Sequence, residues 1–147
     1  MSQNEIDFTF VIPNTRWHRG GEGRYWNHIP YPEGILTAVL RKNGFKVNHI
    51  DANVNDYTEE ELYEEVSKKA GKVVGISALS VEYRDAVHKT FGIIKSARPY
   101  VKTVLGGVYP SISPEVAKRD ENVDFIVISE GENRLLQLMN CLKNNQT

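Results

Sequence analysis

Five short apolar runs, separated by segments of helical periodicity, restrict the fold of this sequence more than any other feature. The runs cover residues 8–12, 47–50, 72–77, 104–105 and 125–128. Between them, apolar residues recur at helical spacing, as in the stripe of Val87, Phe91 and Ile94. Because the runs are continuously apolar, the strands should be buried on both faces. The sequence therefore predicts an α/β fold, an open doubly wound five-stranded parallel sheet of flavodoxin-like or Rossmann-like type, in the order 2-1-3-4-5 with helices on both faces.

Local signals at the ends of the helical segments agree with this alternation. Thr58 and Glu61 have the spacing of a capping box, and Asn43-Gly44 offers a left-handed helix end. The 147 residues contain no internal repeat and suit one domain, so residues 1–147 are expected to form a single unit with its core in residues 8–142.

Charge and cysteine content exclude several classes of partner. The net charge of −1 gives no reason to expect nucleic acid, and no apolar run is long enough to span a membrane. The single cysteine, Cys141, excludes an internal disulfide and a cysteine-built zinc or iron–sulfur site within this chain. A reducing, cytoplasmic location is expected.

Ligands of doubly wound sheets bind beyond the carboxyl ends of the strands, at the point where the strand order reverses. This rule selects the loops at residues 13–33, 77–82, 106–114 and 129–133. The first of these is far longer than ordinary connections of about 2–6 residues, and it is rich in aromatic residues, including Trp17 and Trp26. It could cover the sheet edge or a domain interface, or it could cover a flat, partly apolar ligand.

The usual occupants of such a fold do not match the sequence. A dinucleotide would require Gly-x-Gly-x-x-Gly directly after the first strand, but Gly21-Glu-Gly23 follows no strand directly and has Trp26 at the third position. A Walker phosphate loop is absent. A phospho-receiver domain needs acidic residues where this chain has Asn14 and Ser77-Ala-Leu-Ser80.

The remaining pattern is an ordered set of strand ends. Strand three ends in Gly75-Ile-Ser77, strand four in Leu105-Gly-Gly107 with Ser111 beyond it, and strand five in Ser129-Glu-Gly-Glu132. Pro13-Asn14, Gly20-Gly21 and Pro114-Glu115 add to the set. This pattern resembles the cobalamin-binding domain family, and most closely the N-terminal cobalamin (B12)-binding domain of cobalamin-dependent radical SAM enzymes.

The resemblance implies where the cofactor would bind. The nucleotide tail would enter a channel beside the switch point, lined by Gly106 and Gly107, with Ser77 near its base or ribose and Ser111 near its phosphate. The full set of expected cofactor contacts is Asn14, Trp17, His18, Gly20, Gly21, Ser77, Leu79, Ser80, Gly106, Gly107, Val108, Tyr109, Ser111, Ser129, Glu130, Gly131 and Glu132. Structural alternatives remain: the glycine pair could form a tight turn, the Ser77 hydroxyl could be bonded by nearby backbone, and Glu130-Gly-Glu132 could simply begin the last helix.

The lower ligand of cobalt is a separate question. Family members that coordinate cobalt through the protein carry Asp-x-His-x-x-Gly, whereas this chain has Arg16-Trp-His-Arg-Gly-Gly21. An arginine cannot orient the imidazole of His18 as a carboxylate does. We therefore expect His18 to lie in the loop below the corrin without ligating cobalt, and we expect no protein metal ligand in this chain.

The resemblance further implies that cobalamin would carry a methyl group between S-adenosylmethionine and a substrate. In such enzymes S-adenosylmethionine and a [4Fe-4S] cluster are bound outside this type of chain, by a radical SAM barrel domain with Cys-x-x-x-Cys-x-x-Cys, in cis or in trans. The chain is not expected to catalyse a reaction alone. Two alternatives remain: a degenerate domain without cofactor that serves as an interaction or substrate-positioning module, and a domain for another nucleotide-tailed ligand.

Overall fold

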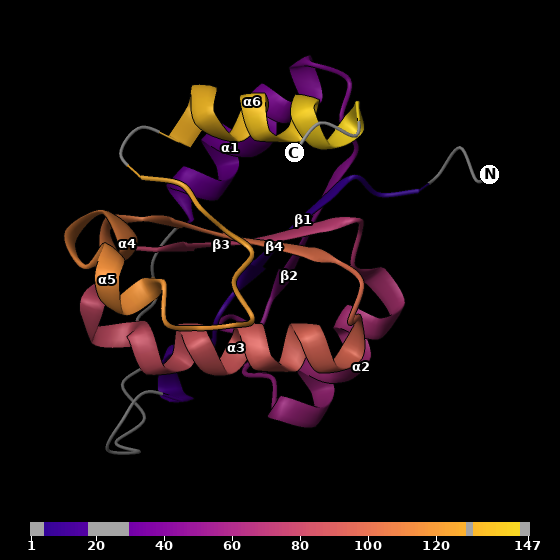
Figure 1. The fold of residues 1–147 in the computed structure, drawn as a ribbon. Coiled ribbons are helices and arrows are strands. Elements are labelled where there is room, and N and C mark those ends of the chain that lie inside the picture. Colours follow the sequence, from indigo (N-terminus) through magenta and orange to yellow (C-terminus); the bar gives the residue numbers. More distant parts are fainter. Residues whose placement is uncertain (1–4, 18–29, 129–130, 145–147) are drawn as a thin grey trace.

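A five-stranded parallel sheet forms the centre of the molecule in a computed structural model that describes residues 5–17, 30–128 and 131–144 (Figure 1). The strands lie in the order β2-β1-β3-β4-β5, and all neighbouring pairs are parallel. Their bounds are Phe8–Ile12 for β1, Val47–Asp51 for β2, Val73–Ala78 for β3, Lys102–Gly107 for β4 and Phe125–Ile126 for β5. The predicted fold class and strand order are confirmed.

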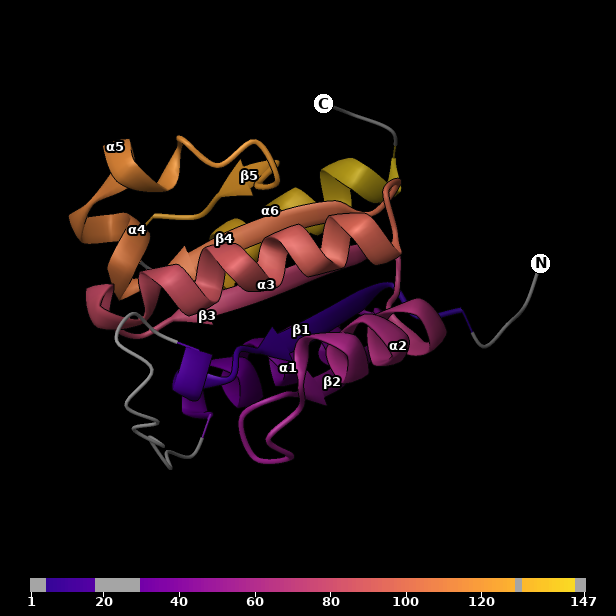
Figure 2. The same cartoon turned by 90° about the horizontal axis from the view of Figure 1, so that it is seen from below.

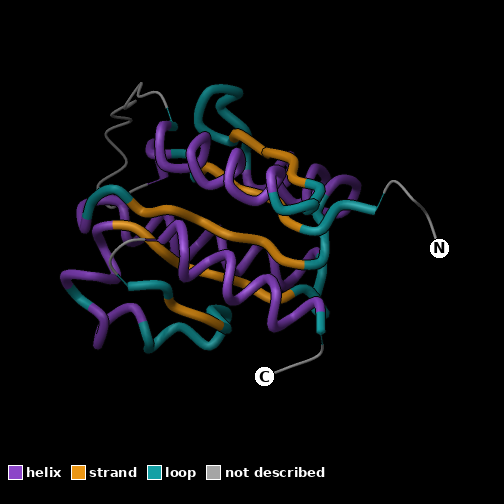
Figure 3. Tube along the Cα trace, turned by 90° about the horizontal axis from the view of Figure 1, so that it is seen from above, coloured by secondary structure: helices purple, strands orange, loops and turns teal. Residues whose placement is uncertain are grey.

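Helices cover both faces of the sheet. On one face lie α1 (Tyr31–Lys42) and α6 (Gly131–Lys143), and on the other lie α2 (Glu59–Lys69) and α3 (Arg84–Ala97). Seen from below in Figure 2, α3 lies over β3 and β4 while α2 lies beside β1 and β2. Figure 3 looks down on the α1–α6 face. Within the residues that the structure describes, the short segments are two 3-10 turns, Thr15–Trp17 (η1) and Val81–Tyr83 (η2), and two short helices after β4, α4 (Val108–Ile112) and α5 (Pro114–Ala117).

The local end signals form as predicted. The Thr58 hydroxyl accepts a hydrogen bond from the Glu61 backbone N–H at 3.1 Å, and the Thr58 N–H donates to the Glu61 carboxylate at 3.3 Å. Gly44 follows α1 with a φ of +89°, a left-handed conformation that glycine adopts without strain. Both helix ends therefore have the geometry that the sequence signals indicate.

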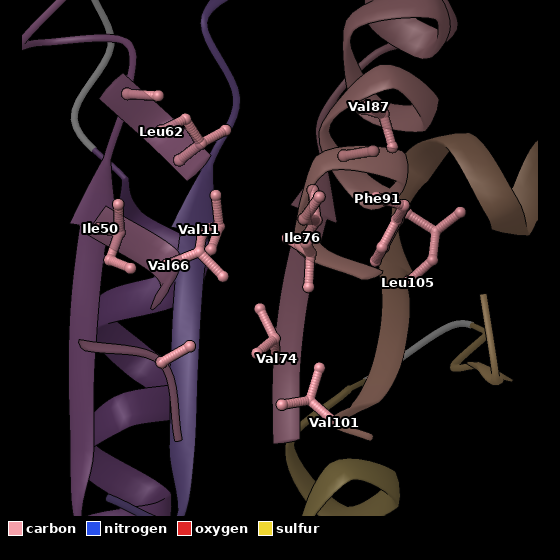
Figure 4. Packing of buried hydrophobic residues seen from close by; sticks show 14 of the residues in the cluster. Val11, Ile50, Leu62, Val66, Val74, Ile76, Val87, Phe91, Val101 and Leu105 are labelled. Carbon is pink, nitrogen blue, oxygen red and sulfur yellow. The ribbon is translucent and has the colours of Figure 1, made fainter. Parts of the chain in front are cut away.

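The side chains of the sheet divide into two buried clusters. The cluster under α2 and α3 includes Val74, Ile76 and Leu105, and Figure 4 shows their packing with Phe91 of α3. The cluster under α1 and α6 includes Phe8, Phe10, Val104, Leu135 and Met139. Because successive residues of a strand point to opposite faces, each strand contributes to both clusters.

Strands four and five differ in length from the prediction. β4 begins at Lys102 rather than at residue 104, because Lys102 and Thr103 pair with Val73 and Val74 of β3. The buried Thr103 also donates its N–H to the Asp124 carboxylate at 2.9 Å. β5 ends at Ile126 rather than at residue 128. No helix within the described ranges is both long and apolar enough to cross a membrane.

Candidate cofactor cleft

A hollow on the α1–α6 face arises from the small residues at the carboxyl ends of β3 and β4. Ser77 pairs with Gly106 across the two strands, and one pleat earlier Gly75 pairs with Val104. Gly75 lets the ring of Phe8 lie directly against its backbone, where a Cβ would collide. A Cβ on Gly106 would lie 3.7 Å from the Val127 carbonyl oxygen, an ordinary contact, so this glycine leaves space open at the sheet surface.

The resulting cleft has a volume of about 310 Å³. Its walls come from the sheet, from α1, from the start of α6 and from the loops at the sheet edge. Of the described residues that line it, only Tyr31, Ser77 and Glu132 have polar side-chain atoms. The lining residues are Phe8, Phe10, Tyr31, Pro32, Ile35, Leu36, Gly75, Ile76, Ser77, Leu79, Val104, Gly106, Gly107, Val108, Val127, Gly131, Glu132 and Leu135.

Ser77 is the polar group at the edge of the sheet surface. Among the described residues, the Ser77 hydroxyl makes no hydrogen bond, and in particular none to nearby backbone groups. Ser77 and Leu79 also line a second cavity of about 200 Å³ between the ends of β1 and β3, where the strand order reverses. Glu33, on the first turn of α1, is buried at this second cavity. The carboxyl edge therefore has an apolar cleft and a smaller, more polar cavity side by side.

Gly106 and Gly107 have different structural requirements. Gly107 has a φ of +95°, and a Cβ there would lie 2.6 Å from the carbonyl oxygen of Ala78. Its position therefore requires glycine for backbone reasons, at the turn from β4 into α4. Gly106 has no such conflict and faces the cleft. Gly107 therefore has the tight-turn geometry that was one alternative for the glycine pair. Gly106 leaves open space at the cleft, as the expected channel for the nucleotide tail requires.

Several other expected contacts lie at the rim of the cleft. Leu79 and Val108 line it and are 37% and 46% exposed, and Gly131 and Glu132 line it from the start of α6. Ser80 lines the second cavity, and its hydroxyl accepts a hydrogen bond from Glu82 N–H at 3.2 Å. Ser111 does not line the cleft; its hydroxyl donates to the Gly107 carbonyl at 3.0 Å.

Tyr109 lies on the other side of the sheet. Its side chain is fully buried in the cluster under α2 and α3, and its hydroxyl lies 2.8 Å from Nε2 of His88. Nδ1 of His88 lies 2.7 Å from a carboxylate oxygen of Asp120. Burial raises the pKa of the Tyr109 phenol; Arg84 opposes this shift and Asp120 adds to it. Tyr109 therefore remains a neutral phenol that fixes α4 to α3.

The described part of the first loop is anchored away from the cleft. The side-chain amide of Asn14 is fully buried and donates to Asp56 at 3.0 Å and to the Tyr57 carbonyl at 3.1 Å. Arg16 forms an ion pair with Asp56 at 3.1 Å and donates to the Asn53 carbonyl at 3.0 Å. Trp17 packs against the core under α2 and α3. His18, Gly20, Gly21, Ser129 and Glu130 lie outside the described residues.

Sequence reasoning missed the apolar walls. Phe10, Leu36, Val104, Val127 and Leu135 line the cleft, yet each has the pattern of an ordinary core residue. One signal was available, since Gly75 interrupts an apolar strand, which often marks a close approach of another group. Ile35 of α1 also lines the cleft and is 49% exposed. The sequence does not indicate this, because the exposure depends on how the helix lies over the sheet.

Comparisons with known proteins agree with this geometry. A B12 binding domain model matches residues 28–139. The chain is 31% identical over 135 residues to an anaerobic magnesium-protoporphyrin IX monomethyl ester cyclase of Rubrivivax gelatinosus, covering 90% of this chain and 24% of that protein. It is 25% identical over 134 residues to a cytidylyl-2-hydroxyethylphosphonate methyltransferase of Streptomyces wedmorensis, covering 78% of this chain and 25% of that protein. The chain thus spans about a quarter of the length of these relatives.

Solved structures show the same fold. The radical S-adenosylmethionine methyltransferase TsrM of Kitasatospora setae matches with a TM-score of 0.80 and 18% identity, over 95% of this chain and 26% of that one. The cobalamin-dependent radical enzyme OxsB, solved with aqua-cobalamin and S-adenosylmethionine, gives 0.76 and 23%, over 95% and 19%. A cobalamin-binding protein of Desulfitobacterium hafniense gives 0.62 and 16%, over 90% and 57%. With the family model covering most of its length, the chain belongs to the B12-binding domain family.

Proposed function

We propose that this domain holds cobalamin in the base-off form, with the dimethylbenzimidazole base displaced from cobalt and the nucleotide tail inserted into the cleft between the sheet, α1 and α6. The observation that carries the proposal is the open sheet surface at Ser77 and Gly106, next to a hydroxyl without a partner among the described residues. The corrin ring would then lie outside the cleft, over the carboxyl edge of the sheet.

The residues present fit such a tail. A cleft of about 310 Å³ is at the lower end of the range of about 300–1,000 Å³ for small-molecule pockets. It can therefore take one flat base but not a corrin. Its walls are largely apolar, which suits the hydrocarbon surface of dimethylbenzimidazole. The exposed Leu79 and Val108 lie at the mouth, where an apolar ring surface would rest.

Each group of the cleft has a distinct task in this proposal. The Ser77 hydroxyl donates a hydrogen bond to the ring nitrogen that the displaced base exposes. Phe10, Val104 and Leu135 exclude water from the base, and Gly106 leaves its path free of a side chain. Cobalamin, when bound, supplies the reactive cobalt, while the protein supplies binding and orientation.

The cobalt should have no ligand from the protein in this arrangement. Arg16, which replaces the aspartate of the histidine-ligating motif, is bonded to Asp56 and Asn53 in the loop after β2. Its guanidinium is therefore occupied in anchoring the first loop. This supports the proposal that His18 does not coordinate cobalt.

The wider role that we propose is that of the cofactor-carrying domain of a radical SAM methyltransferase-type enzyme. The support is that the chain spans about a quarter of its curated relatives, one of which is a methyltransferase, and that two fold neighbours are radical S-adenosylmethionine enzymes. S-adenosylmethionine and a [4Fe-4S] cluster would bind to a barrel domain, in cis or in trans.

The test compares hydroxocobalamin with cobinamide, which lacks the nucleotide tail. The protein is mixed with each, desalted, and its visible spectrum recorded. We expect stoichiometric retention of cobalamin and binding of cobinamide at least about 100-fold weaker, because a buried base contributes both apolar area and a hydrogen bond. Equal binding of the two would contradict tail insertion, and colourless protein in both cases would favour the interaction module.

Two serine variants and one spectrum sharpen this test. Ser77→Ala should weaken cobalamin binding about 5–10-fold through the lost hydrogen bond, while Ser80→Ala, which lies at the second cavity, should leave it unchanged. In the reduced cobalt(II) form, electron paramagnetic resonance should show no nitrogen splitting. A splitting that disappears in His18→Ala would instead identify His18 as the lower ligand.

A further inference from the structure

We infer that the cleft selects among cobamides by the polarity of their lower base, and that it accepts an apolar benzimidazole while rejecting a purine such as adenine. This inference rests on the proposed insertion of the tail. The ligand class it names is cobamides whose base has a hydrocarbon surface and one free ring nitrogen.

The inner part of the cleft offers apolar side chains. Three strands lie in register there, with Phe10 beside Gly75 and Gly75 beside Val104. Phe10 and Val104 are 2% and 4% exposed, and Leu135 of α6 is 4% exposed. The backbone groups of these strand residues belong to the sheet ladder and are not available to a ligand.

The polar groups of the cleft lie farther out. Ser77 is one pleat nearer the carboxyl edge than Gly75. Tyr31, 68% exposed, and Glu132, also exposed, are at the mouth. A base that reaches the inner wall therefore finds one hydroxyl beside it and no other side-chain hydrogen-bonding group among the described lining residues.

The two kinds of base differ in how many polar groups they bring. Displaced dimethylbenzimidazole has a single free ring nitrogen, which the Ser77 hydroxyl can satisfy. Adenine has three ring nitrogens and an amino group beyond its attachment to ribose. The Val127 carbonyl near Gly106 can accept from the amino group and the Ser77 hydroxyl can donate to one ring nitrogen, so two ring nitrogens are left without a partner. Each polar group buried without a hydrogen bond lowers affinity by about tenfold. The two methyl groups of dimethylbenzimidazole gain about fourfold each from burial against apolar walls.

The experiment measures three dissociation constants by absorbance titration, for cobalamin, for the cobamide with adenine as lower base, and for cobinamide. We expect the adenine cobamide to bind at least about 100-fold more weakly than cobalamin, close to cobinamide. If cobalamin and the adenine cobamide bind equally while cobinamide is weak, the selectivity is overturned and tail insertion stands. If all three bind equally, tail insertion itself fails.

Variants locate the selectivity on the inner wall. Val104→Thr replaces one methyl group by a hydroxyl of nearly equal volume beside the base. This should reduce the preference for cobalamin over the adenine cobamide by about tenfold. Val127→Thr, at 9% exposure, provides a second wall variant should Val104→Thr fold poorly. Val116→Thr, at an exposed position of α5 outside the cleft, is the matched control and should leave the preference unchanged. An unchanged preference in both wall variants would overturn the assignment to the inner wall.

Discussion

At the carboxyl ends of β3 and β4, the side of the sheet under α3 is filled by side chains, whereas the side under α1 and α6 is hollow. Ile76, Ala78 and Leu105 point into the filled side and are almost fully buried. The alternate residues Ser77 and Gly106 face the hollow side. Because side chains alternate along a strand, two small residues can open a cleft on one face while the opposite core remains intact. Binding and stability are thus separated within the same two strands.

The largest expected effect tests the filled side. Phe91→Ala removes a fully buried ring from α3 and should lower the free energy of unfolding by about 3–5 kcal/mol through lost contacts and a new cavity. The matched change on the cleft side, Ile35→Ala at 49% exposure, should cost less than about 0.5 kcal/mol. Urea denaturation of both variants provides the measurement. Equal losses would show that the two sides do not differ as described.

The next effect tests the hollow side. Gly106→Val places a branched side chain in the cleft, so cobalamin should bind at least about 100-fold more weakly, a loss of about 2.7 kcal/mol in binding free energy. The domain should still fold. Gly34→Val, at an exposed position of α1 where a Cβ meets nothing within 4 Å, is the control and should bind normally. Circular dichroism reports the fold and absorbance titration the affinity. Normal affinity in Gly106→Val would contradict the proposed path of the tail.

A smaller effect concerns a charged contact that joins α3 to the loop before β5. Burial alone would raise the pKa of Asp124, but hydrogen bonds from Lys95 and Thr103 outweigh it, and the pKa lies below its ordinary value of 3.8. Its contribution to stability is therefore full above that value and is lost as the pH falls through the folded pKa.

Asp124→Asn keeps an oxygen for the Thr103 N–H but removes the charge. The variant should be less stable than the natural sequence by about 1 kcal/mol at neutral pH, since both partners of the pair are partly solvated. This difference should shrink when urea denaturation is repeated at pH values further and further below 3.8. A difference that is constant with pH would show that the charge of Asp124 does not carry the effect.

The smallest effect decides on which side Tyr109 acts. Tyr109→Phe loses the hydrogen bond to His88, and because His88 is partly solvated, the cost should be about 0.5–1 kcal/mol in unfolding free energy. Cobalamin affinity should remain unchanged, since Tyr109 does not line the cleft. A clear loss of affinity with unchanged stability would place Tyr109 in the cofactor site, as the sequence pattern suggested.

The sheet and its carboxyl edge could be predicted because they follow from local patterns. Apolar runs and their order define the strands, and the edge rule then selects Ser77, Leu79 and Gly106 without knowledge of the packing. The walls from α1 and α6 could not be found in this way. Leu36 and Leu135 follow the same periodicity as core leucines, and only the placement of α1 and α6 on the sheet makes them line the cleft.

Two expected contacts show a different limit of the sequence. Tyr109 follows the glycine pair by two residues, but α4 begins at Val108, and the rotation of about 100° per helical residue turns Tyr109 away from the cleft that Val108 lines and into the cluster under α2 and α3. Asn14 follows β1 at the edge, but Asp56 and Tyr57, more than forty residues away, occupy its amide. Such long-range partners leave no local pattern.

The placement of the cleft between the first and last helices has a consequence for the lifetime of the domain. Leu36 of α1 and Leu135 of α6 line the same space, and the two helices also contact each other. A tail wedged there would bridge segments from opposite ends of the sequence, and ligand that binds only the folded state stabilises it. Loading should therefore slow amide hydrogen exchange and protease cutting most in α1 and α6, whose local opening would release the tail, and less in α2 and α3. Proteases would then degrade domains without cobalamin faster than domains that hold it.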